Sequence, residues 1–216
     1  MSTLTHFIQV GLEDMNPLGI TGRVLFRLHG FLANRPDASL AVDFPDWQAP
    51  STFMSAGLGK TIRILGTKDT LAEFLSKTGL IQFLIEGGIV VSGIKPVPET
   101  VTQFVQVQRT YSISRLDKLL KNPELIKYDE NEPVDEHFKE LAAQQNTSPA
   151  LLAKVDQLMN RLHQEKRRTA SVKVHSESTG RPFVMNVSRE VIEQPSELAK
   201  YSTYGLSLEG SCIPAW

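Results

Sequence analysis

The stretch N-P-L-G-I-T-G-R-V-L-F-R-L-H-G-F-L-A-N, residues 16–34, predicts the helix around which we expect the chain to fold. Asn16 can cap free backbone N–H groups, and Pro17 needs no N–H at the first helical position. Apolar residues then recur at helical spacing, at Ile20, Val24, Leu28, Phe31 and Leu32. His29 falls at the edge of this stripe, where its imidazole can reach solvent or a ligand. An imidazole suits proton transfer at neutral pH, although a structural or solvated histidine is the commoner explanation for the helix taken alone.

The composition is that of a globular protein. The 216 residues are 41% hydrophobic and 22% charged, enough for one large domain or two small ones. The net charge of −1 by itself argues against a nucleic-acid binder. The charges are uneven, however, because an acidic segment at residues 129–140 separates basic segments at 109–121 and 161–173. These basic segments are either phosphate-binding surfaces or solvated helix faces.

Targeting and membrane signals are weak. The longest apolar run, residues 80–91, is interrupted by Gln82, Glu86 and glycines, so no segment is expected to span a bilayer. The N-terminal residues M-S-T-L-T-H do not have the pattern of a secretory signal. The single cysteine, Cys212, has no partner for an internal disulfide and excludes a Cys-based zinc site. We therefore expect a cytoplasmic protein that binds no membrane.

Residues 1–96 are predicted to form a ferredoxin-like (RRM-like) domain within an α+β protein. Strands are expected at residues 5–12, 39–44 and 61–65 and within 89–94. Asp69 is expected to cap a second helix that ends at Lys77, and Arg63 is expected to face outward from its strand. The resulting β-α-β-β-α-β order is the ferredoxin-like arrangement, which hosts many functions and does not specify a ligand.

Residues 97–216 are predicted to form a second α+β domain after a linker, P-V-P-E-T, at residues 96–100. The strand expected at residues 102–111 alternates apolar residues with glutamines. A glutamine row suits the reading of base edges, but a solvated edge strand has the same pattern. Further elements are expected as helices from Ser114, at 134–145 and at 148–168, and as strands at 170–176 and 182–187.

Short polar motifs occur in a particular order along the chain. L-H-G at residues 28–30 precedes V-D-F-P-D at 42–46, S-E-S-T-G at 176–180 precedes Phe183, and Y-G-L-S at 204–207 precedes P-A-W at 214–216. Taken together they resemble the CRISPR repeat-processing endoribonucleases of subtype I-F, the Csy-four family. The matching motifs lie near both ends of the chain, so the resemblance covers most of it.

This resemblance implies an endoribonuclease, independent of metals and cofactors, that cuts CRISPR repeat RNA at the 3′ base of its stem-loop. It also implies that the enzyme stays on the guide RNA beside the other subunits of a type I-F surveillance complex. By position, His29 matches the catalytic histidine, Ser176 the serine that fixes the 2′-hydroxyl, and Tyr204 the tyrosine that orients the histidine. The residues predicted to bind RNA are Gln106, Gln108, Arg109, Arg115, Lys118, Lys121, Arg161, Arg167, Arg168, Ser178, Thr179 and Phe183.

The chemistry of RNA cleavage accounts for these residue types. RNA carries its own nucleophile, a 2′-hydroxyl beside the scissile phosphate, which needs a base and exact placement. A neutral imidazole accepts the proton and a serine hydroxyl holds the oxygen in line, giving a 2′,3′-cyclic phosphate and a 5′-hydroxyl. This route requires no metal, and the sequence has no carboxylate or His/Cys cluster at ligand spacing.

The chain departs from the family pattern in its basic residues. Members usually place an arginine-rich helix after the glutamine strand, in the major groove of the stem. Residues 114–121 hold only Arg115, Lys118 and Lys121, and an acidic insertion follows. Either this helix binds RNA less strongly, or Arg161, Arg167 and Arg168 replace it.

Two alternatives to the enzyme hypothesis are a non-cleaving repeat-binding subunit and an unrelated RNA-recognition module. The presence of His29, Ser176 and Tyr204 argues against the first alternative. The second alternative requires exposed aromatic residues on a central strand, which the sequence does not show.

Overall fold

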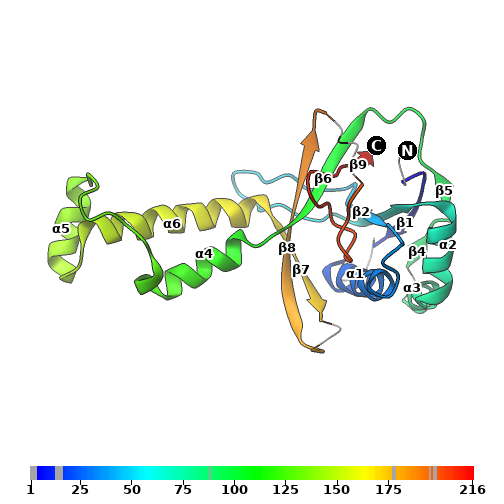
Figure 1. The fold of residues 1–216 in the computed structure, drawn as a ribbon, viewed down its shortest axis with the longest axis horizontal. Helices are drawn as coiled ribbons and strands as arrows, with labels where there is room; N and C mark the ends of the chain where they lie inside the picture. The colour runs from blue at the N-terminus through cyan, green and yellow to red at the C-terminus, as the bar shows by residue number, and fades with distance from the viewer. Residues whose placement is uncertain (1–3, 13–16, 88, 177–178, 195, 197–198) are drawn as a thin grey trace. The chain divides into compact units, whose positions relative to one another are not determined.

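A computed structural model of the chain describes residues 4–12, 17–87, 89–176, 179–194, 196 and 199–216. Residues 111–168 form one compact unit, and residues 1–110 together with 169–216 form the other. The protein is α+β, as predicted, and the larger unit contains two antiparallel sheets (Figure 1). The ferredoxin-like assignment of residues 1–96 and the boundary at residue 97 stay predictions.

The first sheet has the strand order β2-β3-β1-β4, with β5 also paired with β1. Its strands are β1 (His6–Gly11), β2 (Ala41–Asp43), β3 (Thr61–Gly66), β4 (Val90–Val91) and β5 (Lys95–Pro96). The helices of this part are α1 (Pro17–Ala33), α2 (Lys68–Lys77) and α3 (Leu80–Glu86). The strands and helices expected from hydrophobic periodicity are therefore present, and α3 is an additional helix.

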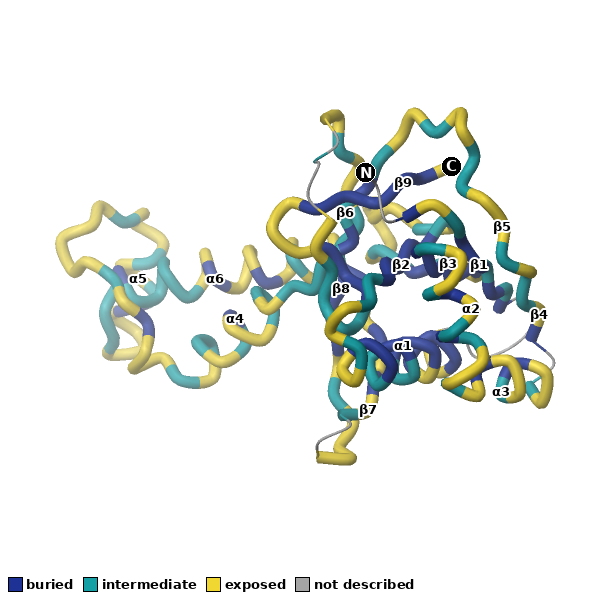
Figure 2. Tube along the Cα trace, turned by 45° about the vertical axis from the view of Figure 1, so that its right-hand side comes forward, coloured by how far each residue is buried: buried dark blue, intermediate teal, exposed yellow. Residues whose placement is uncertain are grey.

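The second sheet has the order β7-β8-β6-β9. Its strands are β6 (Gln103–Thr110), β7 (Ala170–His175), β8 (Pro182–Ile192) and β9 (Ile213–Ala215). Helix α1 packs directly on β7, because a Cβ atom added to Gly22 would lie 2.0 Å from the carbonyl oxygen of Lys173. Figure 2 shows that buried residues line α1 and the inner strands, so one apolar core joins the helix to both sheets.

Two details at the ends of helices differ from the prediction or lie outside the described residues. The N-cap of α2 is Thr67 and not Asp69, because Thr67 has an extended backbone and its hydroxyl accepts a 3.1 Å hydrogen bond from the Thr70 N–H. Asp69 instead lies in the first turn, where its negative charge interacts favourably with the positive end of the helix dipole. Asn16, the predicted cap of α1, lies outside the described residues.

The prediction that Arg63 faces outward is wrong. Arg63 is buried, and its guanidinium lies 3.8 Å from the centre of the Trp216 ring and 3.9 Å from Asp43 Oδ2. Arg189 on β8 donates to Asp43 Oδ1 at 2.8 Å. Strand β3 is covered on both faces, so its arginine must find its counter-charge inside the protein. The buried Asp43 carboxylate thereby links β2 and β3 of the first sheet to β8 of the second.

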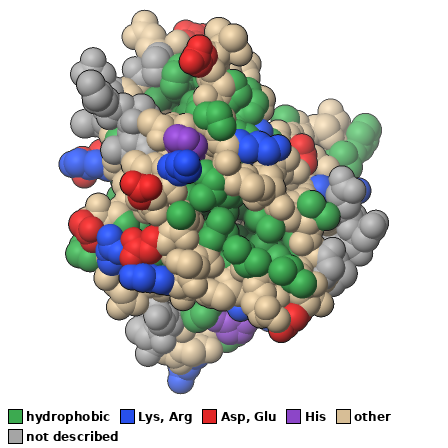
Figure 3. Space-filling view, turned by 90° about the vertical axis from the view of Figure 1, so that its right-hand side faces the viewer, with side chains coloured by type: hydrophobic (Ala, Val, Ile, Leu, Met, Phe, Trp, Pro, Cys, Tyr) green, Lys and Arg blue, Asp and Glu red, His purple; other side chains and the backbone are tan. Residues whose placement is uncertain are grey.

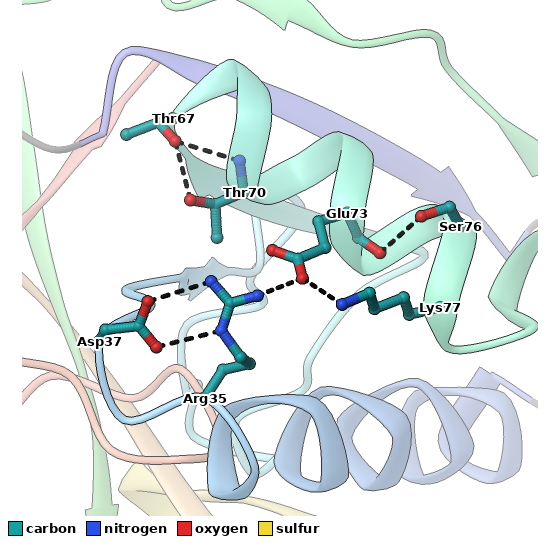
Figure 4. A network of polar contacts seen from close by, with 7 residues as sticks. All are labelled: Arg35, Asp37, Thr67, Thr70, Glu73, Ser76 and Lys77. Carbon is teal, nitrogen blue, oxygen red and sulfur yellow. Dashed lines mark hydrogen bonds and ion pairs between the residues drawn. The ribbon is translucent and has the colours of Figure 1, made fainter.

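A polar network connects the end of α1 to α2 (Figure 4). Arg35 donates to Asp37 at 3.0 Å and also to Glu73, and Glu73 pairs with Lys77 at 2.6 Å. Hydrogen bonds from Lys77 and Arg35 lower the pKa of the Glu73 carboxyl below its ordinary value. The network therefore fixes the exit of α1 relative to α2 through charge-assisted contacts.

The face that bears α2 and α3 is mixed in character (Figure 3). Leu80 and Leu84 of α3 are buried, while Ile81 and Ile85 are exposed. Figure 3 shows apolar side chains gathered on this face, with Lys, Arg, Asp and Glu side chains scattered around them. This face therefore does not concentrate the positive charge that RNA phosphates favour.

The smaller unit is helical. It contains α4 (Ser112–Lys121), a 3₁₀ turn η1 (Pro123–Leu125), α5 (Glu136–Gln145) and α6 (Pro149–Arg168). Its core is formed by Leu116, Ile126, Leu158 and Leu162. Helices α5 and α6 agree with the prediction, and α4 begins two residues earlier than expected, at Ser112. The Ser112 hydroxyl donates to Glu165 on α6. None of the helices in the described residues has the length and apolarity needed to cross a membrane.

Candidate active site

His29 lies on the last part of α1, half-buried at the edge of the apolar stripe. The stripe is buried, and its members near the histidine are Leu28, Phe31 and Leu32. Packing of α1 through Gly22 onto β7 then fixes the helix against the second sheet. The histidine backbone is therefore anchored by core residues, as the sequence pattern predicts.

The loop that contains Y-G-L-S is held at both ends. The Val42 N–H donates to the Gly205 carbonyl at 2.8 Å, and the Ser207 N–H donates to the Val107 carbonyl at 2.7 Å. Gly205 has φ of +72°, and a Cβ atom there would lie 2.8 Å from Val42 Cγ2. Only glycine fits this position, because other residues would meet both an unfavourable backbone conformation and a blocked space. The loop is thus tied to β2 and to β6.

Two consecutive residues of this loop contact the His29 ring. Thr203 Oγ1 lies 2.8 Å from Nδ1, and the Tyr204 ring stacks on the imidazole with centroids 4.3 Å apart and planes at 5°. Tyr204, which the resemblance gives the role of orienting the histidine, therefore lies against His29, and that role stays a prediction. Thr203 was not among the predicted site residues, and its place directly before Y-G-L-S was the only sequence signal for it.

The aromatic contacts continue from Tyr204 to β8 and β6. Phe183 meets Tyr204 edge to face, with centroids 6.3 Å apart and planes at 77°. The Arg109 guanidinium lies 5.2 Å from the centre of the Phe183 ring, which is cation–π distance. The predicted residues His29, Tyr204, Phe183 and Arg109 thus form one continuous row, which we call the aromatic row.

Ser176 lies directly after β7, in the hairpin that also carries Phe183. The hairpin is closed by two backbone hydrogen bonds, from the Ser176 N–H to the Arg181 carbonyl at 2.9 Å and from the Gly180 N–H to the Ser176 carbonyl at 2.8 Å. The Ser176 hydroxyl oxygen also accepts from the Thr179 N–H at 3.3 Å. Val174, two residues before Ser176, pairs with Phe183 across the hairpin. Ser178, another predicted RNA-binding residue, lies outside the described residues.

The glutamine side chains of β6 interact with one another. Gln106 Nε2 donates to the Gly210 carbonyl at 2.7 Å, and Gln108 Nε2 donates to Gln106 Oε1 at 3.3 Å. Val105 and Val107 between them are buried, as the alternating pattern predicts. These contacts orient the two amides side by side on one face of the strand.

The predicted basic residues of the smaller unit are exposed on two helices. Arg115, Lys118 and Lys121 lie on α4, and Arg161, Arg167 and Arg168 lie on α6. Lys121 forms an ion pair with Asp117 at 2.7 Å, which offsets part of the charge of α4. The cations thus belong to a different unit from the aromatic row, and their role in RNA binding stays a prediction.

Across the described residues, no three His, Cys, Asp or Glu side chains converge as a metal site requires.

Comparison with known proteins gives one result for the whole chain. No curated protein matches the chain. The family described as CRISPR-associated protein (Cas_Csy4) matches residues 8–216, which include His29, the hairpin after β7 and the Y-G-L-S loop. The chain therefore belongs to the Cas_Csy4 family of CRISPR-associated proteins.

Proposed function

We propose that this protein is an endoribonuclease that cuts CRISPR repeat RNA at the 3′ base of its stem-loop, with the RNA 2′-hydroxyl as nucleophile. Family membership supports the processing of repeat RNA. The observation that carries the catalytic part is the environment of His29, whose ring is held on its edge by Thr203 and on its face by Tyr204. A histidine that is only solvated at the surface is not expected to make both a hydrogen bond and a stacking contact.

The reaction follows from the nitrogen atoms of this ring. Nδ1 is engaged by Thr203, so we assign proton transfer to Nε2. In the forward step Nε2 takes the proton of the 2′-hydroxyl, the 2′-oxygen forms a bond to phosphorus, and the bond from phosphorus to the 5′-oxygen breaks. The 5′-oxygen takes up a proton from solvent water, to which Nε2 later returns its own proton, and the products are a 2′,3′-cyclic phosphate and a 5′-hydroxyl. The reaction moves protons and exchanges one phosphorus–oxygen bond for another, so it balances without a metal or organic cofactor.

Ser176 is proposed to hold the 2′-hydroxyl in line with the scissile phosphate. Its position supports this role, because the hairpin that carries it is closed by hydrogen bonds and follows a strand that packs on the helix of His29. Correct alignment of the reacting atoms supplies a large part of the rate in such reactions. Tyr204 and Thr203 position the base, and Ser176 positions the nucleophile.

RNA binding is proposed to use the aromatic row and the polar face of β6. Phe183 offers a ring for stacking at the base of the stem, with Arg109 beside it as a cation for the phosphates. Gln106 and Gln108 lie on β6, beside β8, and offer amides for base edges. Thr179 and the cations of α4 and α6 are proposed to contact the RNA backbone. We also propose that the enzyme works in the cytoplasm and keeps its product as a subunit of a type I-F surveillance complex.

The test is cleavage of a stem-loop CRISPR repeat in excess chelator by the wild type and by His29→Ala, with analysis of the product ends. The wild type should leave a 2′,3′-cyclic phosphate, and His29→Ala should bind the hairpin without cutting it. A strict demand for magnesium would refute the mechanism, and loss of hairpin binding in His29→Ala would make the histidine structural.

A 2′-deoxy substitution at the nucleotide before the cut tests the nucleophile. The substituted hairpin should bind with unchanged affinity and resist cleavage, because the attacking oxygen is missing. Continued cutting would show that water or another group attacks. Binding without cutting by the wild type on unmodified RNA would support the non-cleaving subunit in place of the enzyme.

A further inference from the structure

The Thr203 hydroxyl joins two parts of the chain that are 174 residues apart. Its oxygen lies 2.8 Å from Nδ1 of His29, within the range of a normal hydrogen bond. Among the described residues, the hydrogen-bond partner of the Thr203 hydroxyl is His29. A side chain whose polar atom reaches one particular ring nitrogen has a specific effect on that ring.

The loop around Thr203 is rigid enough for this contact to have a defined direction. The Gly205 N–H donates to the Ser202 carbonyl at 2.8 Å, and the Ser202 N–H donates to the Leu206 carbonyl at 2.8 Å. The Leu206 N–H also donates to the Ser202 hydroxyl at 3.1 Å. Thr203 and Tyr204 lie between these hydrogen bonds, so the loop presents both side chains to the histidine as one unit.

The two contacts restrict different motions of the imidazole. Stacking on Tyr204 fixes the plane of the ring, with an angle of 5° between the two rings, but a 180° flip about the Cβ–Cγ bond keeps that plane and exchanges the positions of the ring nitrogens and carbons. A hydrogen bond at Nδ1 favours one of the two flipped orientations, because the other would present a ring carbon to Thr203, and it therefore fixes the side on which Nε2 lies. Tyr204 alone is thus insufficient to aim the base.

The two directions of this hydrogen bond correspond to the two neutral tautomers of the ring, because a threonine hydroxyl can accept from Nδ1–H or donate to Nδ1. When the hydroxyl oxygen accepts from Nδ1–H, the lone pair is on Nε2, where a base needs it. After Nε2 has taken a proton, Nδ1–H is still present and still has its acceptor. The opposite arrangement, with Thr203 donating to Nδ1, would place a hydrogen on Nε2 and disable the base.

We propose that Thr203 is a positioning residue that holds His29 in the Nδ1–H tautomer with Nε2 aimed at the 2′-hydroxyl of the RNA. The kinetic part of this proposal rests on the proposed function, whereas the tautomer is a property of the free protein. Loss of one such hydrogen bond is expected to reduce the cleavage rate about tenfold.

The experiment compares the wild type with Thr203→Val, which keeps the shape and removes the hydroxyl, and with Thr203→Ser, which restores it. Thr100→Val serves as the matched control, because Thr100 is exposed in a loop outside the site. ¹⁵N NMR of protein labelled at histidine reports the tautomer without RNA, with the His29 signals assigned by their absence from His29→Ala. Single-turnover cleavage and affinity for the 2′-deoxy hairpin complete the set.

The wild type, Thr203→Ser and Thr100→Val should show the Nδ1–H tautomer, and Thr203→Val should shift toward Nε2–H. Thr203→Val should cut about tenfold more slowly with unchanged affinity, and serine should restore most of the rate. An unchanged tautomer in Thr203→Val overturns the proposal. So does a loss of affinity in place of rate, which would make the hydroxyl an RNA ligand. If the wild type does not cut, the proposed function fails while the tautomer readout still decides the role of Thr203.

Discussion

Gly22 is the contact through which α1 positions His29 relative to the second sheet, so Gly22→Ala should disturb the site from a distance. The added Cβ would lie 2.0 Å from the Lys173 carbonyl oxygen, and a carbon atom requires at least 3.0 Å there, so helix and strand must separate by about 1 Å. The obstructing atom belongs to the backbone of β7 and cannot rotate away. Since β7 leads into Ser176 and α1 carries His29, the base moves relative to the serine whichever element yields.

The expected magnitude follows from this displacement. A misplacement of about 1 Å in a reacting constellation costs about 100-fold in rate. Overpacking costs about 1–3 kcal/mol of folding free energy, and alanine in a helix returns about 0.5–1 kcal/mol relative to glycine. Gly22→Ala should therefore be folded, with its free energy of unfolding lower by about 2 kcal/mol or less, and should be strongly impaired in cleavage.

The assay is single-turnover cleavage of the repeat hairpin, with urea unfolding and binding to the 2′-deoxy hairpin measured in parallel. Gly19→Ala is the control, because Gly19 is exposed in the first turns of the same helix. A wild-type cleavage rate in Gly22→Ala would refute the reasoning, and so would an equal loss in Gly19→Ala.

Three further predictions concern the supports of the site. Asp43→Asn should lower the free energy of unfolding by about 3–5 kcal/mol in urea, because it removes the buried carboxylate that pairs with both Arg63 and Arg189. The exposed Asp156→Asn should have little effect, and a small and equal loss in both variants would contradict this reasoning. Gly205→Ala should lower the melting temperature more than Gly180→Ala, because both glycines have a positive φ but only Gly205 is crowded, by Val42. Equal decreases in melting temperature would show that this crowding is unimportant. The pKa of Glu73 is lowered in the folded protein, so its ion pairs stabilise the fold at neutral pH, and this contribution disappears as the pH falls through the lowered pKa. Glu73→Gln should therefore have a lower melting temperature than the wild type at neutral pH and the same melting temperature in acid. A constant difference in melting temperature across that range would contradict the assignment.

Features that depend on neighbouring residues could be predicted from the sequence. The apolar spacing after residue 16 gave the helix of His29, and the alternation of valine and glutamine gave β6 with its valines buried. Helix periodicity also gave α5 and α6. These elements form from local hydrogen bonds and from one apolar face, and the residue spacing within a short stretch of sequence predicts both.

The details that were wrong or missed depend on distant contacts. Arg63 looked like an outward-facing residue, because nothing near it in sequence shows that β3 is covered on both sides or that Asp43 and Trp216 will surround it. The sequence predicts Asp69 as the N-cap of α2, but Thr67 is equally suitable by residue type, and only the backbone conformation decides between them.

By itself, the sequence determined that the chain is α+β, that its motifs occur in the order of the Cas_Csy4 family, and that His29 and Tyr204 are candidates for one site. Only the tertiary structure decided how that site is built: α1 packs on β7 through Gly22, and the loop tied to β2 and β6 brings Thr203 and Tyr204 to the imidazole. The physical reason is that the direction and tautomer of a histidine depend on the atoms within hydrogen-bond distance of its ring. Here one such atom, Thr203 Oγ1, comes from a residue 174 positions away in the chain.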